Sequence, residues 1–481
     1  MTEQQVATPA ELELHPLHPP LSEEIGKAGE LLKTKLNDKI VFSSLALIEP
    51  DKADVKAFDA GDKPAALARR LRVAGYDFVQ SQSFVGTVDV TADTVENLEW
   101  LDNSQAPINF VDVVRVITAV KEDEGWQAAM RKRGVEDFEL VQIDPWPAGG
   151  FIHPSIPEGH RAMRAISFVR EDKFDNGYAR PIQGLMAHVD ITAGKVVHLE
   201  DHGVVDIPPE SGRYDAEHQP QLRESPKPLS ITQPEGVSFK VDGYAVEWQK
   251  WRFRVSMHPI HGLVLHRVTY DDAGKERSIL YRASLSDMVV PYGDPDPMHQ
   301  WKHVFDASEA SIGNIPNSLK LGCDCLGEIH YFDIDLIDYK GKARQIENAI
   351  CMHEEDYGIL WKHYDAQTQT AEVRRSRRLV VSAIHTVGNY EYGFFWYFYL
   401  DGTLQMEVKL TGIVGVSAVA PGEERPEYAP LVSTQLASPV HQHLFNFRLD
   451  FDLDDTPMSV QEVNTRPLPL DYQDDPKIGR A

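Results

Sequence analysis

The sequence has few cysteines and no long apolar run, and both shortages exclude classes of protein. Three of its 481 residues are cysteine. Cys323, Cys325 and Cys351 are too few for a disulfide framework and badly spaced for a structural zinc site, which usually has four ligands. No stretch of about 20 apolar residues occurs, so no membrane-spanning helix is predicted. Met1–Glu13 lacks the charged and apolar segments of a secretory signal. We therefore expect an intracellular protein, cytoplasmic or peroxisomal, without a membrane partner.

Basic residues are also scarce. Lysine and arginine number 48 against 74 acidic residues, which gives a net charge of −26. Binding to nucleic acid needs clustered positive charge that neutralises phosphates, so no nucleic-acid partner is expected. The one basic cluster, residues 374–378, leads into an apolar run and is typical of a strand end with solvated arginines.

Two small units of mixed helix and strand are predicted in the first 205 residues. Helical spacing of apolar residues predicts helices, and β-branched runs predict strands. A polar tail over 1–14, expected to be disordered, precedes the first unit (15–105) and the second (106–205). The predicted elements are a helix from Ser22 to Leu36, a strand over Ile40–Ile48, a helix over Pro64–Val73, helices over Val113–Val120 and Trp126–Arg133, and further strands up to Leu199.

The remainder of the chain is predicted to be mainly β. Residues 206–234 are rich in Pro, Ser, Glu and Gln and form a predicted linker. From 235 to 481, short runs of Val, Tyr, Phe, Trp and Ile alternate with turn residues, and Asp401-Gly402 is a strong hairpin signal. The predicted fold class is α+β, mainly β, with two small α+β domains followed by a large antiparallel β-sandwich domain.

Two histidines in an alternating segment, His441–Leu453, are candidate metal ligands. Residues i and i+2 of a strand face the same side, so His441 and His443 can reach one ion. Imidazole is a usual ligand of copper and zinc. Two surface histidines on a solvated strand would give the same pattern, so the pair alone leaves both interpretations open.

The segment Thr386–Tyr392, Thr-Val-Gly-Asn-Tyr-Glu-Tyr, is by itself a Gly-Asn turn before an aromatic strand with a half-buried Tyr390. It also matches the Thr-x-x-Asn-Tyr-(Asp/Glu)-Tyr motif of copper-containing primary-amine oxidases, and the chain resembles that family from about residue 15 to Val463. In the family, copper and oxygen convert this tyrosine to topaquinone, and a His-x-His at the separation seen here binds copper. The resemblance implies oxidative deamination of primary amines to aldehyde, ammonia and hydrogen peroxide. It makes His441 and His443 the expected copper ligands.

The resemblance also implies further active-site residues. Val290–Pro295, followed by Asp306, would otherwise be a turn and a capping acid. It matches the family element in which the aspartate, here Asp306, is the proton acceptor and the tyrosine, here Tyr292, hydrogen-bonds a quinone oxygen. Asn389 of the motif is expected among the catalytic residues. Trp146 is expected near the substrate channel.

Three structural features follow from the same resemblance. Cys325 and Cys351 match the segment in which the family forms a disulfide. Asp450, Phe451 and Asp452 match residues that hold a second, peripheral cation, for which calcium or manganese is suited by oxygen ligands. Alternating acids on the outer face of a strand are the other interpretation of this segment. Family members dimerise through the large domain, so a homodimer is expected.

The match to the family breaks after His443. The third copper histidine of the family comes near the end of its β domain, whereas no histidine follows His443 and Arg466–Ala481 is rich in Pro and Asp. We therefore expect a β domain that is incomplete at its C-terminus, either as a fragment or as a truncated variant. Two hypotheses result. One is a copper and topaquinone amine oxidase, and the other is a non-catalytic remnant unable to bind copper properly.

Overall fold

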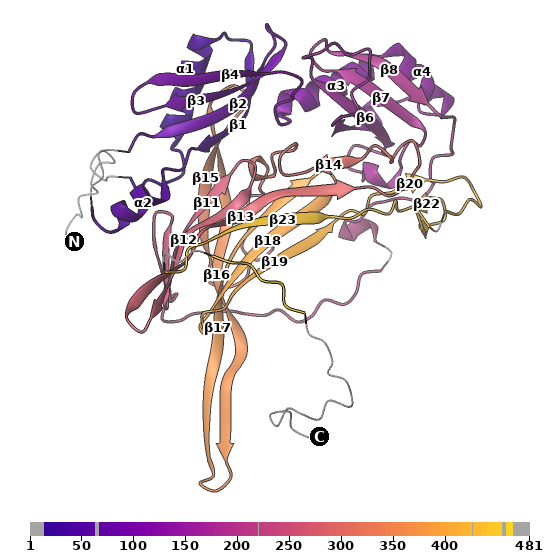
Figure 1. The fold of residues 1–481 in the computed structure, drawn as a ribbon. Helices are drawn as coiled ribbons and strands as arrows, with labels where there is room; N and C mark the ends of the chain where they lie inside the picture. Colours follow the sequence, from indigo (N-terminus) through magenta and orange to yellow (C-terminus); the bar gives the residue numbers. More distant parts are fainter. Residues whose placement is uncertain (1–13, 63–66, 220, 426, 455–457, 465–481) are drawn as a thin grey trace, which may run out of the picture.

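The computed structural model describes residues 14–62, 67–219, 221–425, 427–454 and 458–464. Residues 1–13 of the predicted tail lie outside this set. Two small units of helix and sheet lie above a large β domain, and a long hairpin extends from its opposite side (Figure 1). The predicted fold class, α+β and mainly β, is confirmed, because two antiparallel sheets build the large domain.

The first unit is a four-stranded antiparallel sheet in the order β1-β2-β3-β4, on which helix α1 packs. Ile25 and Leu32 of the helix are fully buried in one cluster with Phe42 and Phe84 of the sheet. Its elements are α1 (Ser22–Lys35), β1 (Ile40–Leu47), α2 (Lys52–Asp59), β2 (Arg70–Asp77), β3 (Gln82–Asp89) and β4 (Thr94–Leu101).

The predicted helix over Pro64–Val73 is wrong. Residues 63–66 lie outside the described set, and β2 begins at Arg70. Leu71 and Val73 are buried while Arg70 and Arg72 are exposed, so the side chains alternate between two faces as a strand requires. Pairing with β1 and β3 outweighs the helix propensity of this Ala-, Leu- and Arg-rich segment.

The second unit packs two helices on another four-stranded antiparallel sheet, β5-β6-β7-β8. The Asn109 side chain caps α3 by accepting hydrogen bonds from two backbone N–H groups of its first turn. Val116, Val120 and Trp126 fill the interface with the sheet. The elements are α3 (Phe110–Glu122), α4 (Glu124–Lys132), β5 (Val141–Pro147), β6 (Ala162–Val169), β7 (Leu185–Asp190) and β8 (Lys195–Asp201).

The large domain is a sandwich of two antiparallel sheets. One has the order β14-β13-β12-β11-β10-β9, with β23 also paired to β13, and the other has the order β15-β16-β17-β18-β19. Aromatic rings join the two layers: the centroids of Phe253 and Phe398 are 4.2 Å apart, and those of Trp251 and Phe398 are 5.3 Å apart. The strands are β9 (Phe239–Asp242), β10 (Ala245–Trp248), β11 (Trp251–His258), β12 (Gly262–Asp272), β13 (Lys275–Pro291), β14 (His303–Phe305), β15 (His330–Ile337), β16 (Ala343–Asp365), β17 (Thr370–Val387), β18 (Tyr390–Tyr399), β19 (Leu404–Gly412) and β23 (Leu444–Phe451).

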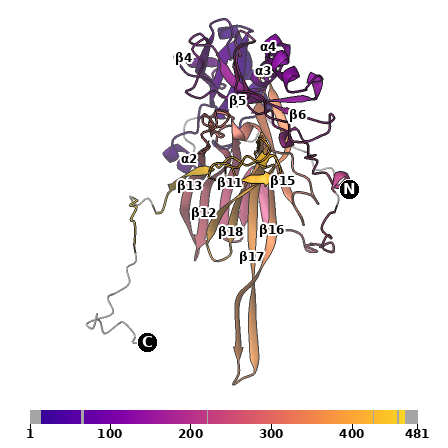
Figure 2. The ribbon, with the colours of Figure 1, turned by 90° about the vertical axis from the view of Figure 1, so that its right-hand side faces the viewer.

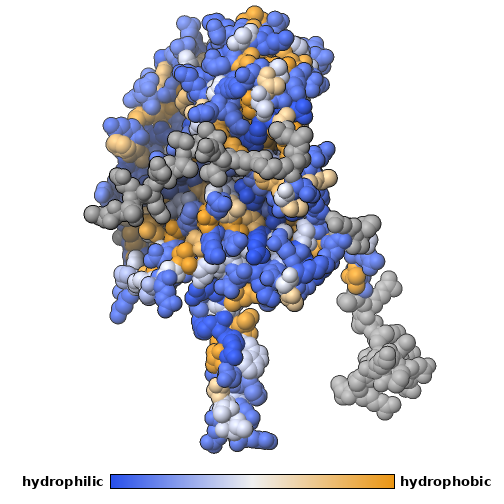
Figure 3. Space-filling model, turned by 90° about the vertical axis from the view of Figure 1, so that its left-hand side faces the viewer, coloured by the Kyte–Doolittle hydropathy of each residue, from blue (hydrophilic) through white to orange (hydrophobic). Residues whose placement is uncertain are grey.

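Strands β16 and β17 continue past the sandwich as a two-stranded arm (Figure 2). The arm carries hydrophobic side chains among hydrophilic ones (Figure 3). Trp361 and Tyr364 on it are 49% and 55% exposed. The arm therefore presents apolar area to its surroundings without a cover from the described part of this chain.

Several connections bear on the predictions. The Asp401-Gly402 turn joins β18 and β19, as predicted. The described residues between β8 and β9 form one short 3-10 helix, Ala216–His218, and no strand. Cys325 and Cys351 form the predicted disulfide, and Cys323 is exposed and free. Among the helices of the described residues, none is long and apolar enough to cross a membrane.

Candidate active site

The motif expected to carry the cofactor forms the turn from β17 into β18. Gly388 has a φ of +59°, a left-handed conformation that residues with a Cβ rarely adopt, so glycine permits this turn. Asn389 Nδ2 donates to the Ile413 carbonyl at 2.6 Å and ties the turn to the end of β19. Tyr390 and Tyr392 are two residues apart on β18 and therefore point to the same face.

Both expected copper histidines lie against these tyrosines. The Tyr390 hydroxyl is 2.9 Å from His441 Nε2, and the Tyr392 hydroxyl is 3.0 Å from His443 Nδ1. The two imidazole centroids are 5.0 Å apart. In contrast to the prediction, both histidines precede β23 rather than lying within it. An isolated β-bridge between Tyr292 and His441 holds the segment in place instead.

The hydrogen bonds fix which imidazole nitrogen carries a proton. His441 Nδ1 lies 2.7 Å from the Pro439 carbonyl, which can only accept, so Nδ1 is protonated and Nε2 keeps its lone pair. The single Tyr392 hydrogen is donated to Asp306, so His443 Nδ1 is the donor to Tyr392 and its Nε2 keeps the lone pair. Burial lowers the pKa of both histidines, to about 4 for His443. Two neutral imidazoles at one place form a donor set that suits copper.

Asp306 follows β14 directly and points into the same site. Its Oδ2 accepts the Tyr392 hydroxyl at 2.9 Å, and the residue is only 5% exposed. Burial raises the pKa of Asp306 to about 7. The Tyr392 hydrogen bond opposes this rise, whereas the charges of Glu309 and Asp287 add to it. A carboxyl group with this pKa can both accept and release a proton near neutral pH.

Tyr292 closes another side of the site. Its ring lies parallel to the His441 imidazole, with centroids 4.5 Å apart and an angle of 10° between the planes. Burial and the neighbouring Tyr390 raise the pKa of Tyr292, so its hydroxyl stays protonated and can donate a hydrogen bond.

A cavity of about 660 Å³ reaches Tyr390 and Asp306. Trp146, which is expected near the substrate channel, lines this cavity. Phe42 of the first unit and Phe110 of the second also contribute to the wall. The site therefore lies where both small units meet one end of the sandwich.

Two residues that the sequence did not indicate also shape the site. The Lys302 ammonium lies 4.5 Å from the ring centroid of Trp146 and 5.2 Å from that of Tyr292, and burial lowers the pKa of Lys302 to about 8. A Cβ on Gly415 would lie 2.9 Å from the Tyr390 hydroxyl. No pattern in the sequence predicts that Lys302 is buried or that Gly415 lies against Tyr390. Tyr392 stands in the motif, but its bridging position depends on tertiary contacts.

The acids expected to hold a peripheral cation are paired with lysines of α2. Lys52 Nζ lies 2.8 Å from Asp450 Oδ1, and Lys56 Nζ lies 2.9 Å from Asp452 Oδ2. Phe451 between them is 45% exposed. The two carboxylates therefore already face two positive charges.

The family assignment rests on matches across most of the chain. The copper amine oxidase enzyme domain matches residues 240–480, and the copper amine oxidase N3 domain matches residues 111–219. The chain belongs to the copper amine oxidase family. A primary amine oxidase of Arthrobacter sp. (strain P1) is 45% identical over 94% of this chain and 69% of that protein. Histamine oxidase of Arthrobacter globiformis is 40% identical over 95% of this chain and 66% of that protein.

A solved structure shows the same family fold. The copper-containing benzylamine oxidase of Hansenula polymorpha matches with a TM-score of 0.83 and 26% identity, over 91% of this chain and 70% of that chain. Membership in the copper amine oxidase family confirms the predicted enzyme class, oxidative deamination of primary amines, and implies copper and topaquinone. None of these relatives favours the alternative of a non-catalytic remnant.

Proposed function

We propose that this chain oxidises primary amines with Asp306 as proton acceptor, Tyr390 as topaquinone precursor, and His441 and His443 as copper ligands. The main support is a set of hydrogen bonds beside one cavity. The Tyr390 hydroxyl contacts His441, and the Tyr392 hydroxyl lies between Asp306 and His443. The overall reaction is R–CH₂–NH₂ + O₂ + H₂O → R–CHO + NH₃ + H₂O₂.

The donor set supports a copper site. The Nε2 atoms of His441 and His443 keep their lone pairs, because the Nδ1 atom of each ring is committed to another hydrogen bond. Copper, when bound, and the topaquinone made from Tyr390 would supply the oxidation of the amine and the reduction of oxygen, which no unmodified side chain can perform. The side chains contribute binding, orientation and proton transfer.

Asp306 is suited to accept the α-proton of the bound amine. Burial raises the pKa of Asp306 to about 7, so a large share of the carboxyl groups is ionised at neutral pH while the group remains a useful base. The hydrogen bond from Tyr392 orients the carboxylate. Tyr292 offers a protonated hydroxyl beside Tyr390. The hydrogen bond from the Asn389 side-chain amide to the end of β19 holds the turn that presents Tyr390.

The cavity supports a monoamine with an apolar tail as the substrate class. Trp146 and Phe110 supply aromatic wall. Asp338 and Arg344 also line the cavity. The Asp338 carboxylate already accepts hydrogen bonds from two backbone N–H groups, and the Arg344 guanidinium would repel a second ammonium group. We expect a higher kcat/KM for phenethylamine than for putrescine, and the reverse order would contradict this substrate class.

Replacement of the base tests the proposed function. Asp306→Asn should lower kcat by about 10²–10⁴-fold, because proton transfer by a positioned group contributes on that scale. The variant should still form a coloured adduct with a hydrazine, because the quinone itself is unchanged. Glu309→Gln is the matched control, because it makes the same acid-to-amide change three residues further along the chain, on a side chain that accepts a hydrogen bond from the Phe305 N–H at 2.8 Å. This variant should keep turnover within a few fold. Full activity of Asp306→Asn would exclude Asp306 as the base.

The arm of β16 and β17 supports a homodimer. Ile359, Trp361 and Tyr364 expose apolar area on it, and contact with a second copy of the chain would remove that area from water. Sedimentation of the purified protein should give twice the mass of the chain. Trp361→Ser should weaken the association, and a wild-type monomer would contradict the dimer.

The ion pairs between α2 and the segment Asp450–Asp452 bear on the expected peripheral cation. Lys52 and Lys56 neutralise Asp450 and Asp452, so we propose that these ion pairs take the structural part expected of calcium or manganese.

An intracellular location stays a prediction. Two similar plant and yeast proteins, diamine oxidase 1 of Nicotiana tabacum and primary amine oxidase of Pichia angusta, are peroxisomal by name, and cell fractionation would test it.

A further inference from the structure

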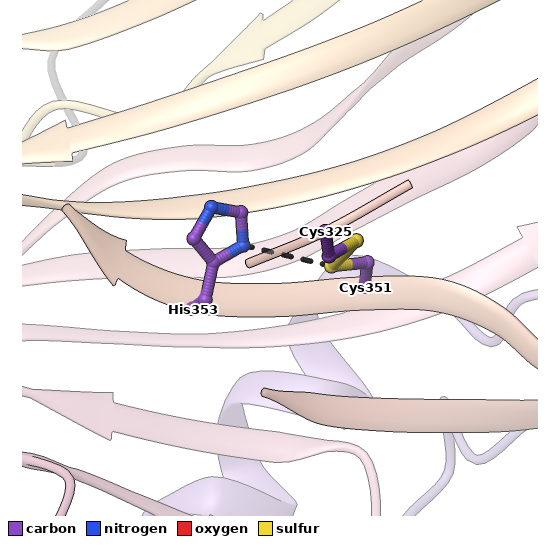
Figure 4. A group of neighbouring side chains, drawn as sticks. All are labelled: Cys325, Cys351 and His353. Atoms are coloured by element: carbon purple, nitrogen blue, oxygen red, sulfur yellow. Dashed lines mark hydrogen bonds between the residues drawn. A yellow bond between two sulfur atoms is a disulfide. The ribbon is translucent and has the colours of Figure 1, made fainter. Parts of the chain in front are cut away.

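Three side chains with metal-binding atoms lie together, and none of them lines the cavity at Tyr390. They are Cys325, Cys351 and His353 (Figure 4), and their ligand atoms all lie within 4.8 Å of one another. All three residues are less than 9% exposed. Cys325 comes from the loop before β15, whereas Cys351 and His353 lie two residues apart on one face of β16. Among the described residues, this is the one such group of three within that distance.

His353 is oriented as a metal ligand would be. Its Nε2 lies 3.2 Å from Glu355 Oε1, and the other oxygen of Glu355 accepts Arg378 Nε at 2.7 Å. A carboxylate beside arginine accepts hydrogen bonds only, so Nε2 carries the proton of the neutral ring and Nδ1 keeps a lone pair. That lone pair faces Cys351 Sγ at 3.5 Å. A carboxylate that holds the distal nitrogen of a histidine is the usual support of a metal-binding imidazole.

In the oxidised state, the Nδ1 lone pair of His353 has no hydrogen-bond donor at the disulfide. In the disulfide between Cys325 and Cys351, neither sulfur carries a hydrogen that could satisfy the Nδ1 lone pair of His353. The hydrogen bond from His353 Nε2 to Glu355 therefore leaves the Nδ1 lone pair facing a disulfide that has no hydrogen to donate to it. A cation at the two sulfurs would fill that place.

We propose that Cys325, Cys351 and His353 form a zinc-binding site when their disulfide is reduced. A dithiol gives two protons and two electrons to the S–S bond, which yields two thiols and the cyclic disulfide of the reductant. Zn²⁺ then displaces one proton from each thiol and binds two thiolates and the His353 Nδ1 lone pair. Water occupies the fourth position, as in sites with three protein ligands.

The loop that carries Cys325 lies at the surface, the side from which reductant and metal would approach. Leu321 and Leu326 on either side of it are 62% and 46% exposed, and Cys323 within it is also exposed. The disulfide spans 26 residues and ties this loop to β16. Zinc would preserve the same tie in a reducing compartment, where thiols prevail over disulfides.

Cobalt is the spectroscopic probe that tests the site. The whole protein is reduced with dithiothreitol, separated from it without oxygen, and titrated with Co²⁺. We expect a thiolate-to-cobalt charge-transfer band that saturates at one Co²⁺ per chain and is bleached by Zn²⁺. The histidines at Tyr390 cannot give this band, because the chain has no cysteine outside 323–351. The oxidised protein should show no band.

Variants separate this ligand set from adventitious thiols. Cys351→Ser should abolish the band, whereas Cys323→Ser, the matched control, should retain it. Glu355→Gln should weaken Co²⁺ binding by about 10–100-fold, as loss of such support does elsewhere, and His353→Gln, which keeps both thiols, should weaken it at least as much. No band in reduced wild type, a band that depends on Cys323 instead of Cys351, or loss of the folded circular dichroism on reduction would each overturn the proposal.

Discussion

The Tyr392 hydroxyl donates a hydrogen bond to Asp306 Oδ2 at 2.9 Å. Tyr392 is fully buried on β18, and Asp306 comes from the loop after β14, so the contact joins the two sheets of the sandwich. The bond favours the ionised form of the carboxyl group and lowers the pKa that burial has raised.

Removal of the Tyr392 hydroxyl should shift the pH dependence of catalysis. Tyr392→Phe deletes the hydrogen bond that lowers the Asp306 pKa, so that pKa rises above about 7 and the acid limb of the kcat/KM profile moves to higher pH. The loss of activity should be larger at pH 6 than at pH 9. Glu309→Gln should move the limb the other way, because the Glu309 charge raises the same pKa. Identical profiles in the two variants would refute this electrostatic account.

Replacement of Tyr390 should separate metal binding from cofactor formation. Tyr390→Phe keeps the ring and removes the hydroxyl that contacts His441. We expect loss of the quinone absorbance and of amine oxidation, with copper content equal to that of the parent protein by elemental analysis. Retained quinone absorbance in this variant would assign the cofactor to another residue.

A methyl group at Gly415 should disturb Tyr390. The added Cβ would lie 2.9 Å from the Tyr390 hydroxyl, so the ring or the loop must move. Overpacking of this kind costs about 1–3 kcal/mol, and we expect a lower Tm together with slower appearance of the quinone. Gly150→Ala, where a Cβ meets nothing within 4 Å, is the control and should change neither. Normal quinone formation in Gly415→Ala would show that the contact does not position Tyr390.

The lysines of α2 should make the fold independent of calcium and sensitive to acid. Although burial would raise it, hydrogen bonds from Lys56 and Ser278 hold the pKa of Asp452 below its usual value. A lowered carboxyl pKa stabilises the folded state above the unfolded value of about 3.9, and this contribution is lost as the pH falls further.

Paired lysine variants provide the measurement. Lys52→Met with Lys56→Met should lower Tm at pH 7, with a smaller effect near pH 3, and Ca²⁺ should raise the Tm of the double variant only. Lys33→Met, which removes a 3.6 Å pair with the exposed Glu30, is the control and should have little effect. A rise in wild-type Tm on addition of Ca²⁺ would favour a cation site instead.

The positions of Tyr390, His441 and Asp306 in the chain were predictable, whereas their bridging contacts were not. The motif and the spacing of the histidines identify residue types that chemistry requires. The bond from Tyr392 to Asp306 depends on how β18 faces the loop after β14, which no local pattern encodes. Strand period alone could have paired Tyr392 with Tyr390 on one face.

Burial of charged groups was the other feature beyond the sequence. Lys302 stands between two recognisable elements, yet its position over the Trp146 and Tyr292 rings follows from the packing of the second unit on the large domain. The helix prediction over Pro64–Val73 was wrong for a related reason. The Ala, Leu and Arg residues of this segment favour a helix locally, and pairing with two neighbouring strands decides otherwise for Arg70–Asp77.

The Gly388 turn has a consequence for how a folded population can be judged. A slip of β18 by one residue would direct Tyr390 and Tyr392 to the opposite face, away from both histidines. A molecule with such a slip could have normal secondary structure and still fail to develop colour. Quinone absorbance per chain would therefore count the molecules whose strands are in register, which circular dichroism cannot distinguish.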